Sequence, residues 1–410
     1  MENELRIGVF GAWRGRTYMK ALHYIDGARV TAVCEKKESR LEKAKADVDG
    51  DCAFYTDFDE FISSGKFDAV ILANYFNEHA TYAIKALEHG IHVFSETMAA
   101  STLADCVRLC RAVEKSGLVY MMAENYPYTR GCLEMKRLYD SGTLGEVRFA
   151  EGEYEHPMSP DENRKYMNAT DNGGFHWRRY LPVTYYSSHS LAPLMYMTGL
   201  YPKRVIGKAV LDTPAHAKEY ERIRSDIAGI MLVEMNNGAL FRISGSSYLA
   251  PHENWYRLSC IEGGTELIRG HKEKLVRLAY NAWSIPEGCE EEKIYEAEFR
   301  ENAEEASHCG HAGSDYFVTR TFVEAVKDKK PFFPDVYAAT AMSATAIMGW
   351  RSVLEDSRQL GIPDFRKEED RRLYENDELT PFPSEGKPNS LPYSTIPIEE
   401  LLGKDAGDEN

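Results

Sequence analysis

The densest concentration of chemically useful side chains lies between Gly173 and Pro193. This segment reads GGFHWRRYLPVTYYSSHSLAP and contains two histidines, a tryptophan, two arginines and three tyrosines, but no aspartate or glutamate. The whole chain, in contrast, carries a formal net charge of −16. Imidazoles, fixed cations and aromatic rings are groups that hold and transform a polyhydroxylated or anionic small molecule. We therefore expect this segment to line a small-molecule site.

Three of its side chains are candidates for proton transfer. Histidine as a residue type ordinarily titrates near neutral pH, so His189 or His176 could act as a general base, and Tyr186 could act as a second proton relay. The structural alternative is a satisfied core histidine, or a tyrosine that anchors a core with its polar tip. We assign these three residues as the candidate catalytic groups.

The neighbouring residues are candidates for substrate binding. Trp177 offers a flat face for a sugar ring, although a core tryptophan is the commoner role. Arg178 and Arg179 are adjacent, and two buried guanidinium groups without partners would be costly. At least one of them should therefore contact an anion, a hydroxyl group or a carboxylate.

A metal-assisted reaction is a further alternative. A divalent ion could polarise an enediolate, and the candidate ligands are Glu153, His156, His176 and His189. Their spacing matches no specific ligand motif, so we assign no metal.

A turn near the N-terminus has features of a dinucleotide-binding loop. After the apolar run Leu5–Phe10, Gly11 supplies a tight turn and Gly15 lets a helix pack closely on a strand. Trp13 stands where a middle glycine normally lets the backbone approach the pyrophosphate. Arg14 would compensate with a charge-assisted contact to that group. All four residues are assigned to cofactor binding.

Polar side chains at strand ends extend this site. Glu35 ends the second predicted strand, 24 residues after Gly11, where a carboxylate binds the ribose hydroxyls and repels a 2′-phosphate. A solvated carboxylate is the alternative, but the strand–turn–helix–strand frame favours NAD over NADP. Asn74 and Glu96 end the fourth and fifth strands, at the edge where such sheets bind ligands. Asn125, just beyond the last strand of the series, is assigned to the same site.

The elements that position these residues alternate between strand and helix over residues 1–123. Ala69–Leu72 is a fully apolar strand, and Ala80, Ala83, Ile84 and Leu87 have the spacing of one buried helix face. This alternation predicts an α/β fold with a doubly wound parallel sheet, a Rossmann domain. From residue 124 to 365 the strands have mixed polarity, which predicts a second α/β domain with one sheet face free. The charged, Pro/Ser-rich segment 366–410 is expected to form an extended tail.

Composition excludes several classes of protein. A chain of 410 residues suggests two domains, and a pI of about 5.3 argues against nucleic-acid binding. There is no apolar run of membrane-spanning length and no secretion signal at the N-terminus. The eight cysteines form no CxxC pair. We expect a reduced, cytoplasmic protein that acts on a small molecule.

Longer stretches resemble the Gfo/Idh/MocA oxidoreductases. The segment DAVILANYFNEHATYAIKALEHGIHVFSE is similar to the N-terminal half of that family, and ENYPYTRGCLEMKRLYDSGTLGEVRFAEGEY is similar to its junction into a second domain. The resemblance covers roughly residues 5–365. It implies an NAD-binding Rossmann domain and an α/β domain with a large, open, mainly antiparallel sheet that commonly supports homodimers or homotetramers.

One branch of the family, the NAD-dependent glycosidases typified by α-N-acetylgalactosaminidase, is similar in more detail. Its motifs resemble GGFHWRR, the run Tyr186-Ser-Ser-His189-Ser-Leu-Ala-Pro and the segment GHAGSD that begins at Gly310. This likeness implies site roles for Tyr186, His189 and His311, the last as a substrate contact. Ser190, Ala192 and Ala312 replace glycines of that branch.

Two positions depart from the family's dehydrogenases. Thr97 follows Glu96 where they carry Glu-Lys-Pro, whose lysine helps to handle the substrate hydroxyl proton. Tyr185 stands where many members carry an aspartate, four residues before the active-site histidine. Both departures weaken the case for an ordinary sugar dehydrogenase.

The glycosidase branch implies a particular reaction. The sugar is transiently oxidised at its 3-position, the aglycone leaves by elimination, water adds, and the ketone is reduced again. Two carboxylates that flank the glycosidic bond are not required, which fits the acid-free segment. Two alternatives stay open: a net NAD-dependent sugar or cyclitol dehydrogenase, and a non-catalytic NAD- or sugar-binding regulator.

Overall fold

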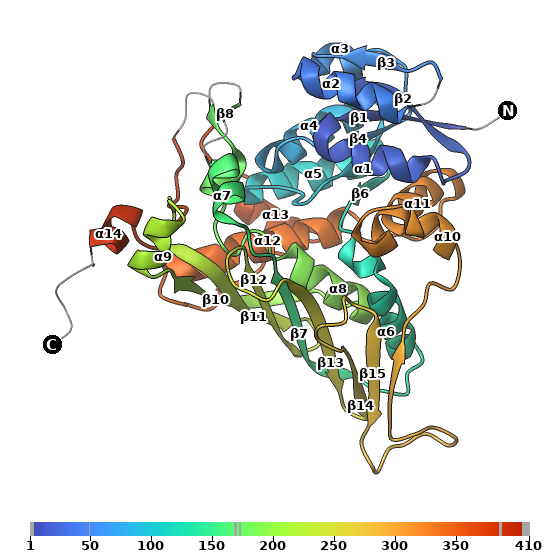
Figure 1. Ribbon diagram of the computed structural model, residues 1–410, viewed down its shortest axis with the longest axis vertical. Coiled ribbons are helices and arrows are strands. Elements are labelled where there is room, and N and C mark those ends of the chain that lie inside the picture. The colour runs from blue at the N-terminus through green and yellow to red at the C-terminus, as the bar shows by residue number, and fades with distance from the viewer. Residues whose placement is uncertain (1–3, 49, 168–169, 172–173, 385–387, 404–410) are drawn as a thin grey trace. The chain divides into compact units, whose positions relative to one another are not determined.

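The computed structural model describes residues 4–48, 50–167, 170–171, 174–384 and 388–403 (Figure 1). The chain forms two compact units, and neither is continuous in sequence. Unit 1 is built from segments 1–134, 297–340 and 364–376. Unit 2 is built from segments 135–296, 341–363 and 377–410.

Unit 1 contains a parallel sheet of six strands in the order β3-β2-β1-β4-β5-β6. The strands are β1 (Leu5–Phe10), β2 (Ala28–Cys34), β3 (Ala53–Tyr55), β4 (Ala69–Leu72), β5 (His92–Ser95) and β6 (Tyr120–Met122). The strand order reverses between β1 and β4, so the carboxyl ends of these two strands border the crevice where doubly wound sheets bind ligands. The predicted Rossmann topology is confirmed.

Helices cover the sheet of unit 1, which explains why strands such as β4 are apolar without interruption. Those from the first segment are α1 (Ala12–Leu22), α2 (Glu38–Ala44), α3 (Phe58–Ile62), α4 (His79–Glu88) and α5 (Leu103–Ser116). The later segments add α10 (Ala303–Ser307), α11 (Ser314–Asp328) and α13 (Glu368–Tyr374). The short 3₁₀ helices are η1 (Lys45–Asp47), η2 (Phe76–Glu78), η3 (Tyr126–Tyr128) and η5 (His311–Gly313).

Helix α11 also packs in unit 1, although it begins 192 residues after the end of β6. The ring of Phe322 stacks on Phe94 of β5 with centroids 4.9 Å apart, and Tyr18 of α1 meets Phe94 at 5.2 Å. All three side chains are essentially buried. This aromatic packing ties α1, β5 and α11 into one core.

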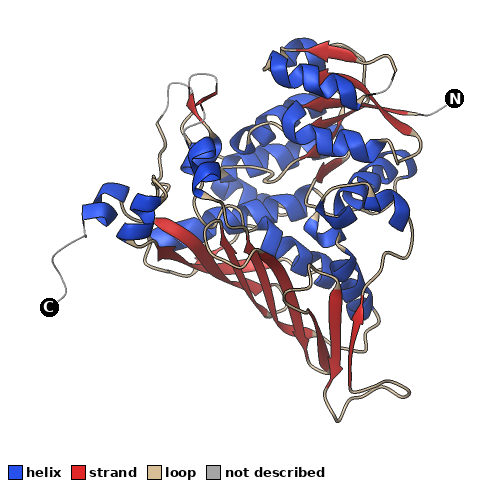
Figure 2. Cartoon of the chain, in the orientation of Figure 1, coloured by secondary structure: helices blue, strands red, loops and turns tan. Residues whose placement is uncertain are grey.

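Unit 2 contains a sheet of nine strands in the order β16-β15-β14-β13-β7-β12-β11-β10-β17. Strands are drawn in red in Figure 2. The strands are β7 (Val147–Glu155), β10 (Pro202–Leu211), β11 (Asp226–Met235), β12 (Leu240–Ser246), β13 (Glu253–Cys260), β14 (Gly263–Leu267), β15 (Leu275–Tyr280), β16 (Glu292–Glu296) and β17 (Leu360–Gly361). Of its paired neighbours, β7 and β12 run parallel and the others run antiparallel. The predicted large, mainly antiparallel sheet is confirmed.

Two helices approach this sheet closely because glycines leave room for them. A Cβ atom at Gly207 of β10 would lie 2.4 Å from the carbonyl oxygen of Gly349 in α12 (Val336–Leu354), and Gly152 of β7 meets α8 (Ser188–Thr198) in the same way. The remaining elements are α6 (Arg130–Asp140), α7 (Pro160–Met167), β8 (Thr170–Asp171), β9 (Gly174–Phe175), η4 (Trp177–Tyr180), α9 (Pro214–Glu219) and α14 (Ile398–Gly403). Over the described ranges, no helix combines the length and the apolar character needed to span a bilayer.

The expectation of an extended tail from residue 366 is wrong for much of that segment. Besides α13 and α14, it makes specific buried contacts: the Oγ of Ser394 accepts the N–H of Ser225 at 2.8 Å, and the indole N–H of Trp350 donates to the carbonyl oxygen of Pro392 at 2.7 Å. Contacts of this kind produce no periodic pattern of apolar residues, so the local sequence does not predict them. Hydrogen bonds to distant residues hold the segment instead.

Candidate active site

The turn after β1 requires its two glycines. Gly11 has a φ of 91°, and a Cβ atom there would lie 2.4 Å from the carbonyl oxygen of Ala73. A Cβ atom at Gly15 would lie 2.5 Å from a side-chain carbon of Val9. Helix α1 therefore begins directly beside the ends of β1 and β4, as a pyrophosphate at a helix N-terminus requires. Trp13, predicted for the same turn, is 48% exposed.

Glu35 lies buried at the end of β2 and faces this turn. Its Oε2 accepts the backbone N–H of Ala12 at 3.0 Å, and its Oε1 accepts the N–H of Lys37 at 3.1 Å. Each carboxylate oxygen has a second lone pair, so the same group can also accept from ribose hydroxyls. A negative charge fixed here repels a 2′-phosphate, which fits NAD.

Asn74, at the end of β4, has a buried side-chain oxygen without a hydrogen-bond partner among the described residues. Its Nδ2 donates to the carbonyl oxygen of Tyr75 at 3.4 Å, while its Oδ1 is buried and accepts no hydrogen bond from the described residues. Buried amide oxygens are normally paired, so an unpaired one at a ligand-binding edge indicates where a ligand donor would bind. With the glycine turn and Glu35, this residue set fits a bound NAD.

Glu96 follows β5 and forms a partly buried ion pair with Arg14. The Nε of Arg14 donates to Oε1 of Glu96, and the hydroxyl of Tyr18 donates to the same oxygen at 2.6 Å. Burial alone would raise the pKa of Glu96, but the charge of Arg14 and the Tyr18 hydroxyl bring this pKa below its usual value. The guanidinium predicted to contact pyrophosphate is thus directed at Glu96. Tyr18 was not foreseen.

His311 and Asn125 meet at Asp315, which is wholly buried at the start of α11. Asp315 accepts a hydrogen bond from Nδ2 of Asn125 at 2.7 Å and contacts Nδ1 of His311 at 2.8 Å. Burial lowers the pKa of His311, but its hydrogen bond with Asp315 outweighs this and raises the pKa above its usual value. A predicted substrate residue and a predicted cofactor residue therefore share one network in unit 1. Asp315 was missed, although it ends the motif that contains His311.

In unit 2, a close approach of helix and strand positions His189. A Cβ atom at Gly152 of β7 would lie 2.1 Å from the carbonyl oxygen of Ser190, so α8 can cross β7 only above a glycine. Tyr154, two residues further along the same strand face, then meets the His189 ring with centroids 4.6 Å apart. Tyr186 meets His189 edge-on at 4.7 Å. The predicted catalytic pair is brought together, and the structure adds Tyr154.

These rings belong to a larger group, which we call the histidine–aromatic cluster. Each member contacts at least one other through ring–ring or cation–π geometry, with centroid distances between 4.5 and 6.3 Å. Its members are Tyr154, His156, Tyr166, His176, Trp177, Arg178, Tyr186, His189 and His252. The guanidinium of Arg178 lies 4.5 Å from the Trp177 ring centroid and 5.4 Å from that of Tyr186. Aromatic faces and cations of this kind can hold a sugar and its polar substituents.

Two predicted residues of the segment also have structural contacts. The Nδ1 of His176 accepts the N–H of Arg178 at 3.2 Å and so caps η4. The guanidinium of Arg179 donates to the carbonyl oxygen of Met167 at 3.2 Å. Both contacts help to shape the loop that presents Trp177 and Arg178.

Of the four residues considered as metal ligands, His156, His176 and His189 belong to the histidine–aromatic cluster, but Glu153 does not. Glu153 lies on the opposite face of β7 from Tyr154, where it pairs with Arg242 and with Arg269 at 2.7 Å. Among the residues that the structure describes, no group of three or more His, Cys, Asp or Glu side chains is placed to hold a metal ion.

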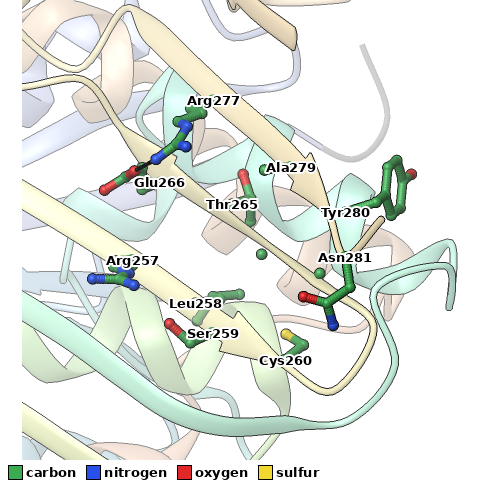
Figure 3. Close-up of a pocket in the computed structure, with 12 residues that line it drawn as sticks. Arg257, Leu258, Ser259, Cys260, Thr265, Glu266, Arg277, Ala279, Tyr280 and Asn281 are labelled. Atoms are coloured by element: carbon green, nitrogen blue, oxygen red, sulfur yellow. Dashed lines mark hydrogen bonds and ion pairs between the residues drawn. The ribbon is translucent and has the colours of Figure 1, made fainter. Parts of the chain in front are cut away.

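A cavity of 270 Å³ opens on the sheet of unit 2, at strands β13, β14 and β15 (Figure 3). It is lined in part by Arg257, Glu266 and Arg277, and Arg277 pairs with Glu266 at 2.8 Å. None of the predicted site residues lines it. The cavity is therefore separate from the histidine–aromatic cluster.

Family comparisons agree with this architecture. The model described as "Oxidoreductase family, NAD-binding Rossmann fold" matches residues 5–124, and the GFO/IDH/MocA C-terminal domain matches residues 132–266. The chain therefore belongs to the Gfo/Idh/MocA oxidoreductase family, with an NAD-binding Rossmann domain at its N-terminus.

Its similarity within that family is to the NAD-dependent glycosidase branch. The C-terminal domain of glycosyl hydrolase 109 matches residues 280–371. A glycosyl hydrolase family 109 protein of Stenotrophomonas maltophilia is 26% identical over 88% of this chain and 89% of its own, and one of Shewanella pealeana is 24% identical over 88% and 86%. The resemblance that the sequence motifs indicate is thus confirmed.

Solved structures share the fold. Levoglucosan dehydrogenase in complex with NADH and levoglucosan aligns with a TM-score of 0.73 at 16% identity, over 88% of this chain and 99% of its own. An Agrobacterium radiobacter oxidoreductase in complex with NAD⁺, L-tartaric acid and magnesium aligns with a TM-score of 0.70 at 16% identity, over 88% and 98%.

Proposed function

We propose that the protein is an NAD(H)-dependent glycosidase, which cleaves a glycosidic bond by transient oxidation at the sugar 3-position, elimination, water addition and re-reduction. The observation that carries this proposal is the contact of His189 with two tyrosines, Tyr154 and Tyr186, at 4.6 and 4.7 Å. This arrangement offers proton-handling groups, whereas direct glycoside hydrolysis commonly uses two facing carboxylates. None of the nine members of the histidine–aromatic cluster carries a carboxylate.

The cofactor supplies reversible two-electron chemistry at a carbinol carbon when it is bound. Unit 1 would hold it through the glycine turn of Gly11 and Gly15, the carboxylate of Glu35 and the unpaired Oδ1 of Asn74. Trp13, placed at the start of α1, would cover part of the dinucleotide. Arg14 would hold Glu96 in position rather than contact the pyrophosphate.

Unit 2 would handle the sugar. His189 would accept the proton removed next to the ketone, because an imidazole nitrogen can act as a general base and this ring meets both tyrosines. Tyr154 or Tyr186 would hold or move the proton of a sugar hydroxyl. Trp177 and Arg178 would bind and orient the ring and its substituents, and the hydroxyl of Tyr256, which donates to the His189 carbonyl oxygen at 2.7 Å, would keep α8 in place.

The test measures product and cofactor together. The protein, reconstituted with NAD⁺, is incubated with a panel of 4-nitrophenyl glycosides, and nitrophenol release and NADH absorbance are followed at the same time. We expect nitrophenol release without NADH accumulation, and at least a hundredfold lower rate in His189→Ala, the order of magnitude of a lost general base. Stoichiometric NADH would show a net dehydrogenase instead. Unchanged NAD binding with no turnover in any glycoside or free sugar would favour a regulator.

We also propose that the protein self-associates through the uncovered face of the nine-stranded sheet. Ile230 and Leu232 of β11 are 39% and 38% exposed on this face. Exposed apolar side chains beside ion pairs are typical of association surfaces. Light scattering should give a dimer or tetramer for the wild type and a smaller species for Leu232→Lys, while an unchanged mass would reject this surface.

A further inference from the structure

The guanidinium of Arg178 is enclosed by aromatic rings without an acidic partner in the described structure. It lies over Tyr166, Trp177 and Tyr186 at 5.2, 4.5 and 5.4 Å from the ring centroids. No described carboxylate lies within ion-pair distance of it, and the Tyr186 hydroxyl is the side-chain hydrogen-bond partner identified for it. A guanidinium has five N–H donors, so this site retains unused donor capacity beside a partly buried positive charge.

Two exposed histidines, His156 and His252, belong to the same cluster as Arg178. The rings of His156 and His252 lie 4.6 Å apart, and both residues are exposed. Partial desolvation of the His156 ring, followed by the positive charges of His252, Arg178 and His189, lowers the pKa of His156, so these basic groups lie close enough to influence it. Glu162 also acts electrostatically on His156, but its carboxylate is already bound to the N–H and hydroxyl of Ser159, both at 3.0 Å.

Two further carboxylates near this rim, Glu153 and Glu253, are engaged elsewhere. Glu153 belongs to the opposite face of β7 and pairs with two arginines, and Glu253 accepts hydrogen bonds from the backbone and side chain of segment 269–270. Among the described side chains, no carboxylate therefore lies within ion-pair distance of Arg178, His156 or His252. A ligand that brings its own negative charge would complete the site.

We propose that the substrate carries an anionic substituent, a carboxylate, sulfate or phosphate, that is bound between Arg178 and the His156–His252 pair. This inference rests on the proposed function, since it names the class of sugar on which that function acts. The planar guanidinium suits two oxygens of such a group, and each imidazole adds a donor N–H. A neutral sugar would leave the same donors without a charged acceptor.

Calorimetry on the NAD-saturated protein tests the proposal. The probes are glucuronate and galacturonate, the 6-sulfates and 6-phosphates of glucose and galactose, and the two neutral hexoses. We expect at least one anionic class to bind about tenfold or more tightly than its neutral counterpart, and the three arms identify which anion is accepted. Arg178→Gln and His252→Phe should each reduce this advantage about tenfold, and His252→Phe should do so without changing the affinity for the neutral hexose. His271→Phe, at another exposed histidine of unit 2, is the matched control and should change neither.

Equal binding of all anionic and neutral probes would overturn the proposal, as would an anion preference that survives both variants. Because His252 is exposed, His252→Phe should fold normally even if Arg178→Gln does not. Cleavage of neutral glycosides by a protein without anion preference would leave the proposed function intact and reject this inference. Anion preference through these residues without any turnover would support the binding site and reject the glycosidase function.

Discussion

The carboxylate of Glu35 and the backbone N–H of Ala12 are joined by a buried hydrogen bond of 3.0 Å. This bond links the end of β2 to the first residue of α1, the two places that a dinucleotide must contact at once. A single side chain therefore both fixes the helix start and sets the charge that faces the ribose. Its two roles can be separated by substitution.

Glu35→Gln should weaken cofactor discrimination while it retains the fold. The amide oxygen still accepts one backbone N–H, but the negative charge that repels a 2′-phosphate is lost. We expect the preference for NAD over NADP to fall about tenfold or more, an effect of one charged contact. Fluorescence titration with both cofactors measures it, and Glu38→Gln on the exposed side of α2 is the control. Equal affinities for the two cofactors in the wild type would refute this role of Glu35.

Gly152→Ala should displace α8 from β7. The new Cβ atom would lie 2.1 Å from the Ser190 carbonyl oxygen, a contact that only movement of the helix relieves. We expect a loss of about 1–3 kcal/mol in the free energy of unfolding, typical of overpacking, together with loss of turnover because His189 moves with the helix. Gly245→Ala in neighbouring β12 is the matched control, since its Cβ would lie an ordinary 3.7 Å from the Tyr154 carbonyl oxygen. Similar effects of both substitutions would contradict the explanation.

These two sites differ in how far the sequence predicts them. The glycine turn and Glu35 act through local geometry, a tight turn and a strand end, so their types and spacing are visible in a short stretch of sequence. The contact of Tyr154 with His189 depends on a helix that crosses a strand 35 residues away in sequence. The alternation of β7 indicates that Tyr154 faces a core, but it does not indicate which helix covers that face.

The hydrogen-bond network around Asp315 could not be predicted from the sequence either, because its members are also distant from one another in the chain. Arg14 and Asp315 are some 300 residues apart in the chain and come within 3.8 Å because α11 packs on α1. The pattern at Arg14 suggests a phosphate contact, since nothing nearby in sequence offers it a carboxylate. Only the return of segment 297–340 brings that second acid beside it, after Glu96 from β5.

Asp315→Asn should lower the pKa of His311 from above its usual value to below it. The hydrogen-bonded carboxylate is what raises this pKa, whereas burial of the ring lowers it and persists in the variant. We expect the His311 pKa to fall when the carboxylate is replaced, as measured by NMR titration of labelled histidine. Asn125→Ala is the control: it removes the other partner of Asp315 but retains the charge, so the His311 pKa should stay raised. An unchanged titration in Asp315→Asn would contradict this account.

Glu155→Gln should stabilise the protein at alkaline pH. Burial, then the charge of Glu153, raises the pKa of Glu155 to about 7, above the value of about 4.3 expected in the unfolded chain. The folded state therefore binds the extra proton more tightly, and the wild type loses stability as pH rises from about 4.5 to 7. Since the group is only half-buried, we expect a gain of about 1 kcal/mol for the variant at pH 8 and none at pH 4.5.

Urea unfolding at the two pH values measures this difference. Glu234→Gln provides a control of opposite sign, because the hydrogen bond from Arg204 lowers the pKa of Glu234, so its charged form favours folding above the unfolded pKa. A Glu155→Gln variant that is less stable than the wild type at pH 8 would show that its charged form is stabilised instead.

Tyr154→Phe should separate a proton-handling role from packing at His189. The substitution retains the ring that meets His189 at 4.6 Å and removes only the hydroxyl, so the fold and NAD binding should be unchanged. If this hydroxyl moves a proton, kcat should fall about a hundredfold, the usual effect of losing a general acid or base.

Tyr256→Phe is the contrasting variant, because its hydroxyl donates to the His189 carbonyl oxygen and holds α8. It should cost about 1 kcal/mol of stability, one buried hydrogen bond, with a smaller effect on kcat. Equal kinetic losses in both variants would assign Tyr154 to packing, and a full loss in Tyr186→Phe alone would make Tyr186 the proton relay.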